Sequence, residues 1–168
     1  MRKIITCAFL LLLWLPACQN SQSVPDGYYP YDIEKVKSAV RQLSFQPEIP
    51  GFVPIPVQVL ISDHYQIMDT EAEALDVSFY TNNNDLLSIQ FVNGEMDEIM
   101  TDSVTVTINE RVKGHYIDNS YAKILYWEKN GINYKMIYRS SGGSIGGKNA
   151  TKEITKSDLV NVAESFHS

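Results

Sequence analysis

Cysteine is almost absent from this chain. Its two cysteines, Cys7 and Cys18, both lie near the amino terminus of the 168 residues. Residues 19–168 therefore contain no thiol, which excludes disulfide bonds, cysteine metal ligands and cysteine nucleophiles from that part of the chain. The histidines are few and lack the spacing of a zinc site; they are His64, His115 and His167. We predict no metal site and no cofactor.

Positive charge is also scarce. The chain has 14 Lys and Arg against 20 Asp and Glu, a formal net charge of −6. Such an acidic chain lacks the basic patch that nucleic acids and anionic lipids require, so we expect no nucleic-acid partner. After the amino-terminal segment, no hydrophobic run approaches the roughly 18 residues of a membrane-spanning helix.

The amino terminus carries the clearest motif. Two basic residues precede an almost uninterrupted apolar run over 4–15, which is too short to cross roughly 30 Å of hydrocarbon but typical of a signal peptide. Leu15, Pro16 and Ala17 then match the recognition sequence of the bacterial lipoprotein signal peptidase, directly before Cys18. The segment resembles that of a lipoprotein precursor, which implies cleavage before Cys18 and attachment of diacylglycerol to its thiol. An ordinary secretory signal peptide that ends near a cysteine is the alternative.

This motif divides the chain into three parts: a signal peptide over 1–17, the lipidated Cys18 with a tether over 18–30, and one domain over 31–168. Removal of the signal peptide would leave 151 residues with a net charge of −8, because Arg2 and Lys3 are lost. Two or three acyl chains, at about 0.8 kcal/mol per buried CH2, would anchor the protein permanently. The expected location is the outer, extracytoplasmic face of the cell membrane.

Alternating apolar and polar residues predict seven strands, at 57–61, 75–80, 87–91, 104–108, 112–117, 122–128 and 133–138. Residues 63–74 are interpreted as a loop or one helical turn. One helix is predicted to begin after Asp32, and another after Thr155, where Asp158 completes an approximate capping box. Strands this close in sequence leave no room for parallel crossovers. The predicted fold class is α+β: an antiparallel sheet of about six or seven strands with an amino-terminal and a carboxy-terminal helix packed on it.

Two hairpins allow a prediction of register. Asn130-Gly131 favours a type I′ turn, which places Trp127 opposite Tyr134. A loop over 82–86 would place Phe79 opposite Ile89, with the apolar side chains of both strands on one face. The proline-rich stretch 45–56 is interpreted as a structural connection packed on the sheet; a ligand for an aromatic groove is the alternative.

Several stretches resemble functional motifs only in part. Residues 142–148 fit the first part of a phosphate-binding loop, but Asn149 stands where Ser or Thr is needed to hold Mg²⁺. Two acidic runs lack the pattern of a calcium loop, and we interpret them as solvated; they contain Asp69, Glu71, Glu73 and Asp76, and Glu95, Asp97, Glu98 and Asp102. No catalytic residue is predicted.

The last third of the chain resembles a family of uncharacterised extracytoplasmic domains of Gram-positive, mostly spore-forming bacteria, which occur on lipoproteins and on anti-sigma-factor-like membrane proteins. The residues that carry the resemblance are 125–128, Gly131, Tyr134 and 154–166. The proline-rich entry is similar too, whereas the glycine-rich insertion after Tyr138 departs from the family pattern. The resemblance implies location and fold but no chemistry.

The leading hypothesis is a non-catalytic, lipid-anchored binding or sensing module with a protein or cell-envelope partner, linked to envelope stress or sporulation. A lipid or lipoprotein carrier is the second, and would need an unfilled apolar cavity lined by Leu125, Trp127, Met136 and Phe166. An envelope hydrolase is the third, and would need a cleft in which carboxylates such as Asp63, Asp69 or Glu95 converge.

Overall fold

The computed structural model describes residues 23–68, 70–94, 102–119, 121–142 and 152–167. Seven strands form one sheet in the order β1-β2-β3-β7-β6-β5-β4, and every neighbouring pair is antiparallel. The elements are α1 (Ile33–Val40), β1 (Val59–Gln66), β2 (Glu73–Tyr80), β3 (Leu86–Asn93), β4 (Val104–Thr107), β5 (Lys113–Asp118), β6 (Lys123–Lys129), β7 (Ile132–Arg139) and α2 (Lys156–Glu164).

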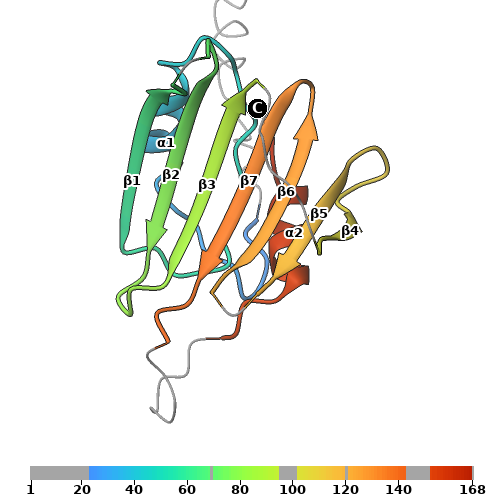
Figure 1. Cartoon of the computed structure of the whole chain (residues 1–168). Helices are drawn as coiled ribbons and strands as arrows, with labels where there is room; N and C mark the ends of the chain where they lie inside the picture. The colour runs from blue at the N-terminus through green and yellow to red at the C-terminus, as the bar shows by residue number, and fades with distance from the viewer. Residues whose placement is uncertain (1–22, 69, 95–101, 120, 143–151, 168) are drawn as a thin grey trace, which may run out of the picture.

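Both helices lie behind the same face of the sheet in Figure 1, α1 beside β1 and β2 and α2 beside β6. The other face of the sheet is turned toward the viewer and carries neither helix. This arrangement confirms the predicted α+β fold with a seven-stranded antiparallel sheet. Within the described residues, neither helix combines the length and the apolar character that crossing a membrane demands.

Side-chain caps fix the start of each helix. The Asp32 side chain accepts a hydrogen bond from the backbone N–H of Lys35, which begins α1 as predicted. At α2, Thr155 accepts from the N–H of Asp158 while the Asp158 carboxylate accepts from the N–H of Thr155. The predicted capping box is therefore confirmed, and it satisfies two backbone donors that would otherwise lack partners.

The β6–β7 hairpin has the predicted register. Asn130 and Gly131 both adopt positive φ angles, 55° and 76°, as a type I′ turn requires. Trp127 lies opposite Tyr134. The Asn130-Gly131 turn therefore sets the pairing of β6 and β7, the two strands that carry Trp127 and Tyr134.

The β2–β3 register differs from the prediction by two residues. Phe79 pairs with Leu87, not with Ile89. The turn is tighter than expected because Thr81 and Asp85 bond to each other: the Thr81 N–H donates to the Asp85 carbonyl, and the Asp85 N–H donates to Thr81 Oγ1. A shift of two residues keeps every side chain on its expected face, so the core composition is as predicted.

β1 also differs from the prediction. The strand begins two residues later than expected and continues to Gln66, through residues assigned to a loop. The alternation stops at Ile61 because β1 is an edge strand whose side chains are largely exposed, so polar residues are tolerated on both of its faces.

The packed part of the domain begins before residue 31. Tyr29 forms a backbone bridge with Val53, and the Tyr28 ring packs against Phe52 with centroids 4.8 Å apart. Val24 also packs against the core. Packing against the domain therefore reaches back at least to Val24.

An aromatic cluster joins the sheet to α2. Trp127 and Tyr134 stack with ring centroids 5.1 Å apart and an interplanar angle of 4°. Phe166 meets both rings edge-on, at 5.1 and 5.6 Å. The proline-rich segment closes the cluster, since the backbone N–H of Glu48 donates to the Tyr134 hydroxyl at 3.2 Å. As predicted, this segment packs on the sheet, with Phe45, Ile49, Phe52 and Val53 buried.

We predict that Trp127→Ala lowers the free energy of unfolding by about 3–5 kcal/mol, because it removes a large buried ring from a filled core. Urea unfolding followed by circular dichroism measures the change. Tyr121→Ala is the control, since Tyr121 is 85% exposed and should change stability by no more than about 0.5 kcal/mol. Equal losses in both variants would contradict the assigned core.

Candidate functional site

A groove runs between the edge strand β4 and helix α2. It consists of two adjoining hollows of about 390 and 310 Å³. The first is lined by Val104, Tyr116, Asp118, Lys123, Glu153, Thr155 and Lys156. The second is lined by Thr105, Val106, Thr107, Lys156, Ser157, Val160 and Asn161. Lys156, the first residue of α2, borders both.

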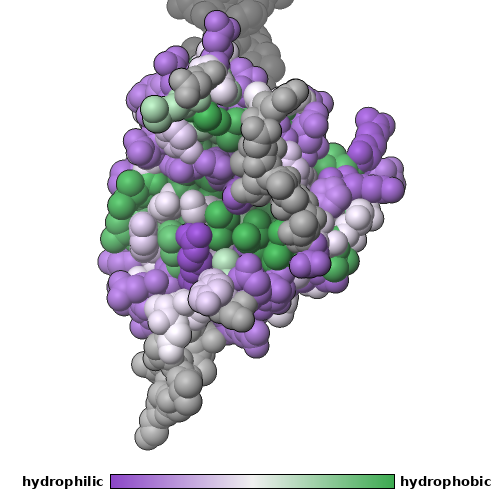
Figure 2. All heavy atoms as spheres, in the orientation of Figure 1, coloured by the Kyte–Doolittle hydropathy of each residue, from purple (hydrophilic) through white to green (hydrophobic). Residues whose placement is uncertain are grey.

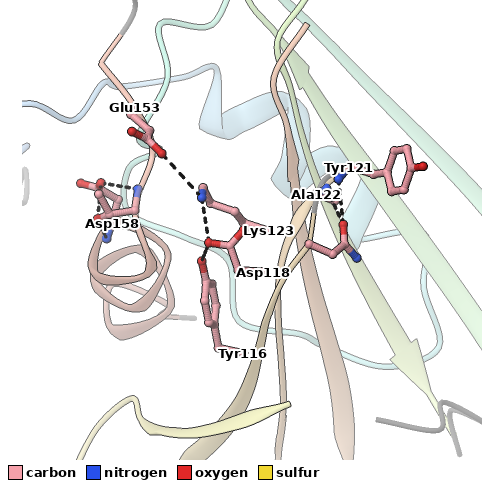
Figure 3. A network of polar contacts seen from close by, with 9 residues as sticks. Tyr116, Asp118, Tyr121, Ala122, Lys123, Glu153 and Asp158 are labelled. Atoms are coloured by element: carbon pink, nitrogen blue, oxygen red, sulfur yellow. Dashed lines mark hydrogen bonds and ion pairs between the residues drawn. The ribbon is translucent and has the colours of Figure 1, made fainter. Parts of the chain in front are cut away.

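Ion pairs hold one end of the groove in place (Figure 3). Lys123 Nζ lies 2.9 Å from Asp118 Oδ2 and 3.8 Å from Glu153 Oε1. The Tyr116 hydroxyl donates to the same Asp118 oxygen at 3.1 Å. The hydrogen bond from Lys123 lowers the pKa of Asp118, while burial and the neighbouring carboxylate raise the pKa of Tyr116. Asp118 is therefore ionised and Tyr116 neutral at physiological pH.

Lys156 differs from the other lysine of the groove. Lys123 is engaged by two carboxylates. Lys156 is exposed and makes no ion pair or side-chain hydrogen bond with any residue that the structure describes. An unneutralised ammonium group at the junction of the hollows, in an acidic chain, favours a ligand that brings negative charge.

The start of α2 is fixed from the opposite side as well. Lys152 and Tyr28 both bond to Asp158 Oδ1, at 2.6 and 3.2 Å. Burial opposes ionisation of Asp158, but the hydrogen bonds from Lys152 and Thr155 outweigh it and lower its pKa. The wall of the groove that α2 provides is therefore held by charged and polar contacts as well as by its buried side.

The face of the sheet without helices carries an apolar band. Strand pairing places Ile61, Ile137, Ile124 and Ile117 in one row across the sheet, interrupted by serines on β2 and β3. Ile61 is 52% exposed. Figure 2 shows hydrophobic patches across this face, between polar ones.

A polar row lies beside this band. Asp63 pairs with Asp76, which is followed across the sheet by Gln90 and Lys135. Tyr65 donates a hydrogen bond to Asp76 Oδ2 at 3.3 Å and accepts one from Gln90 at 2.6 Å. Asp76 Oδ1 is buried and has no hydrogen-bond partner in the described part of the chain. Burial and the charge of Asp63 raise the pKa of Asp76, although Tyr65 and Gln90 oppose the shift.

A third cluster joins Ser44, His64 and Glu73. His64 Nε2 lies 2.6 Å from Glu73 Oε1, and Ser44 donates to Glu73 Oε2 from both its hydroxyl, at 2.5 Å, and its backbone N–H, at 2.7 Å. The carboxylate stands between serine and histidine, whereas nucleophilic catalysis needs histidine between serine and carboxylate. The hydrogen bonds from Ser44 lower the pKa of Glu73. The same contacts attach the segment after α1 to β1 and β2.

Many residues singled out in the sequence are not described by the structure. These are Leu15, Pro16, Ala17, Cys18, Asp69, Glu95, Asp97, Glu98, Asn149 and nearly all of 142–148. Among those described, no three His, Cys, Asp or Glu side chains gather as metal ligands would. Leu125, Trp127 and Met136 are at most 2% exposed, and Phe166 fills the space beside Trp127.

Sequence reasoning did not find the groove, because its walls come from opposite ends of the domain. Lys123 and Lys156 look like ordinary surface lysines in the sequence, and the edge position of β4 follows only from the strand order. No spacing between residues 104–107 and 156–161 would have indicated their proximity.

Comparisons with protein-family models, with curated proteins and with solved structures each give no match to this chain.

We predict that Asp76→Asn raises the free energy of unfolding at pH 7 by about 1 kcal/mol, since it removes a half-buried charge whose Oδ1 atom lacks a hydrogen-bond partner among the described residues. The pKa of Asp76 is raised above its ordinary value of 3.8 in the folded state. Folding therefore favours the protonated form of Asp76. The stability linked to this protonation is complete below the ordinary value and is lost as the pH rises through the pKa of the folded state. The difference between variant and parent should vanish below about pH 4.

Urea unfolding at several pH values measures this difference. Asp26→Asn serves as the control, because Asp26 is exposed, and it should change stability little at any pH. A loss of stability in Asp76→Asn at pH 7 would show that the carboxylate is better satisfied than its contacts indicate.

Proposed function

We propose that this protein is a lipid-anchored, non-catalytic binding or sensing module on the outer face of the bacterial membrane, and that the groove between β4 and α2 receives its partner. The observation that carries the proposal is the groove itself: polar side chains fixed by ion pairs surround one end, and the exposed ammonium group of Lys156 stands in the middle. Such a preorganised surface suits recognition, because little side-chain entropy is lost on binding.

The described clusters of titratable residues support binding over catalysis. In the cluster of Ser44, Glu73 and His64, both Ser44 and His64 bond to the Glu73 carboxylate and not to each other. Asp76 has the raised pKa of a candidate acid, but Asp63 and Asp76 lie side by side on the sheet and do not face each other across a cleft. A glycoside hydrolase needs two carboxyl groups on opposite sides of its substrate.

The packing of the core does not support the carrier alternative. The four residues that would line an acyl-chain cavity are themselves the filling of the core, with Trp127 stacked on Tyr134 and capped by Phe166. Opening a cavity there would expose these rings and forfeit several kcal/mol of packing.

A short tether is consistent with a partner near the membrane. Val24 packs against the core, and the chain from Cys18 to Val24 spans at most about 20 Å when fully extended. An anchored domain would thus meet proteins and envelope components next to the bilayer at high effective concentration.

We predict that the parent protein, expressed in a bacterial host, is found in the membrane fraction with two or three acyl chains on a mature chain that begins at Cys18. Cys18→Ala should lose the lipid and leave the membrane fraction, because no second anchor is expected. Intact-mass measurement and cell fractionation check both results. A parent protein that is soluble and unlipidated would overturn the anchored part of the proposal.

The binding part is tested by photo-cross-linking in cells, with benzoylphenylalanine in place of Lys156 in the groove, Ile61 on the helix-free face, or Asp26 as the exposed control. We expect a discrete adduct from Lys156 and none from Asp26. An adduct from Ile61 alone would move the binding surface to the helix-free face of the sheet. Absence of adducts at all three positions would contradict a binding module.

A further inference from the structure

The hydrogen-bonding groups of β4 show which of its residues face the free edge of the sheet. Ile108, directly after β4, donates its N–H to the carbonyl of Val112 across the strand pair. In an antiparallel pair, hydrogen-bonded residues alternate with residues whose N–H and C=O point the other way. Val104 and Val106 therefore bond to β5, whereas Thr105 and Thr107 direct their N–H and C=O groups away from it. Both threonines line the second hollow of the groove.

β4 is short, with four residues, but this edge lacks the charge and proline that usually prevent strand pairing. Edge strands are commonly protected by charged residues, proline or bulges. The opposite edge, β1, carries Asp63 and His64 in its middle. β4 reads Val-Thr-Val-Thr, which has high strand propensity and no charge, and no described strand pairs with its outer side.

We infer that the groove binds an extended segment of another protein, which adds to the sheet as a strand beside β4 and carries an acidic side chain to Lys156. The inference rests on the proposed binding function and specifies its partner. An added strand would use the free N–H and C=O groups of Thr105 and Thr107, as in known cases of recognition by strand addition.

Strand geometry also defines the side chains of the segment. A residue opposite Val104 or Val106 points to the helix side of the sheet, because paired residues share a face. Near Val106 it meets Val160, and near Val104 it meets Lys156. The groove therefore selects one apolar and one acidic residue separated by a single residue.

A second copy of this chain suits the groove less well. It would bring another unneutralised Lys156 and the same negative net charge, whereas a segment with an acidic residue is complementary. We therefore assign the groove to a different protein and treat self-pairing as an outcome that the test can detect.

The test is an NMR titration of the mature chain with two acetylated hexapeptide amides, Ser-Thr-Glu-Thr-Val-Thr and Ser-Thr-Val-Thr-Glu-Thr. Two peptides are used because the added strand can run parallel or antiparallel to β4. In the free protein, the amide hydrogens of Thr105 and Thr107 should exchange quickly and that of Val106 slowly. On binding of one peptide, the two threonine amides should become protected. Replacing Glu by Gln in that peptide should weaken binding about threefold, the effect of an exposed ion pair.

Two variants separate the backbone from the charge. Thr105→Pro removes an outward N–H and leaves the hydrogen bonds between β4 and β5 intact. It should weaken binding of the Glu peptide and of its Gln form at least fivefold. Asp26→Asn, at an exposed position outside the groove, should bind like the parent. Lys156→Gln should bind the Glu and Gln peptides equally, which keeps the test valid even if the proline variant folds poorly.

Three results would overturn the inference. Peptide binding with shifts confined to another surface would refute strand addition here while leaving a binding function intact. No binding of either peptide, together with an adduct from Lys156 in cells, would show a partner of different chemistry. Protection of Thr105 and Thr107 that grows with protein concentration alone would assign the edge to a second copy.

Discussion

The contact of Phe166 with Trp127 and Tyr134 is the interaction on which the rest of the domain depends. It holds the end of α2 against the central hairpin, with ring centroids 5.1 and 5.6 Å apart. Around it, Ile49 and His167 exchange backbone hydrogen bonds, so the proline-rich segment is joined to the chain directly after α2. Since α2 is fixed at this end, its first turn is held at a set position beside β4, and this position creates the groove.

How far the sequence predicts this fold depends on the range of the interactions. The turn at Asn130-Gly131 and the capping box of Thr155 and Asp158 are local, and both are as expected. The β2–β3 register is set by Thr81 and Asp85, whose mutual bonds the polar turn sequence does not reveal. The groove depends on pairings between residues far apart in the sequence, such as Leu87 with Tyr138. Because β3 pairs with β7 and not with β4, β4 is left at the edge of the sheet.

The helix-free face and the groove offer different kinds of surface. On the face, the Asp76 carboxylate is held by Tyr65 beside a row of isoleucines, and its raised pKa shows that the site stabilises a charge poorly. In the groove, Asp118 has a lowered pKa because Lys123 satisfies it. A surface whose own charges are satisfied, apart from one lysine, presents a defined charge to a ligand. For this reason we propose the groove, and not the helix-free face, as the recognition site.

The amino-terminal segment of the domain is attached to the same helix that forms one wall of the groove. Tyr28 accepts a hydrogen bond from Asn161 at 2.8 Å and donates one to Asp158, and Asn161 itself lines the second hollow. Tyr28 also packs on Phe52 and Tyr29 pairs with Val53, so this segment is attached to the proline-rich connection as well as to α2. Phe166 packs at the other end of α2, so the helix is held at both ends beside the sheet. The amino-terminal segment and the groove thus share one helix, and a partner bound in the groove would contact a residue that also holds this segment.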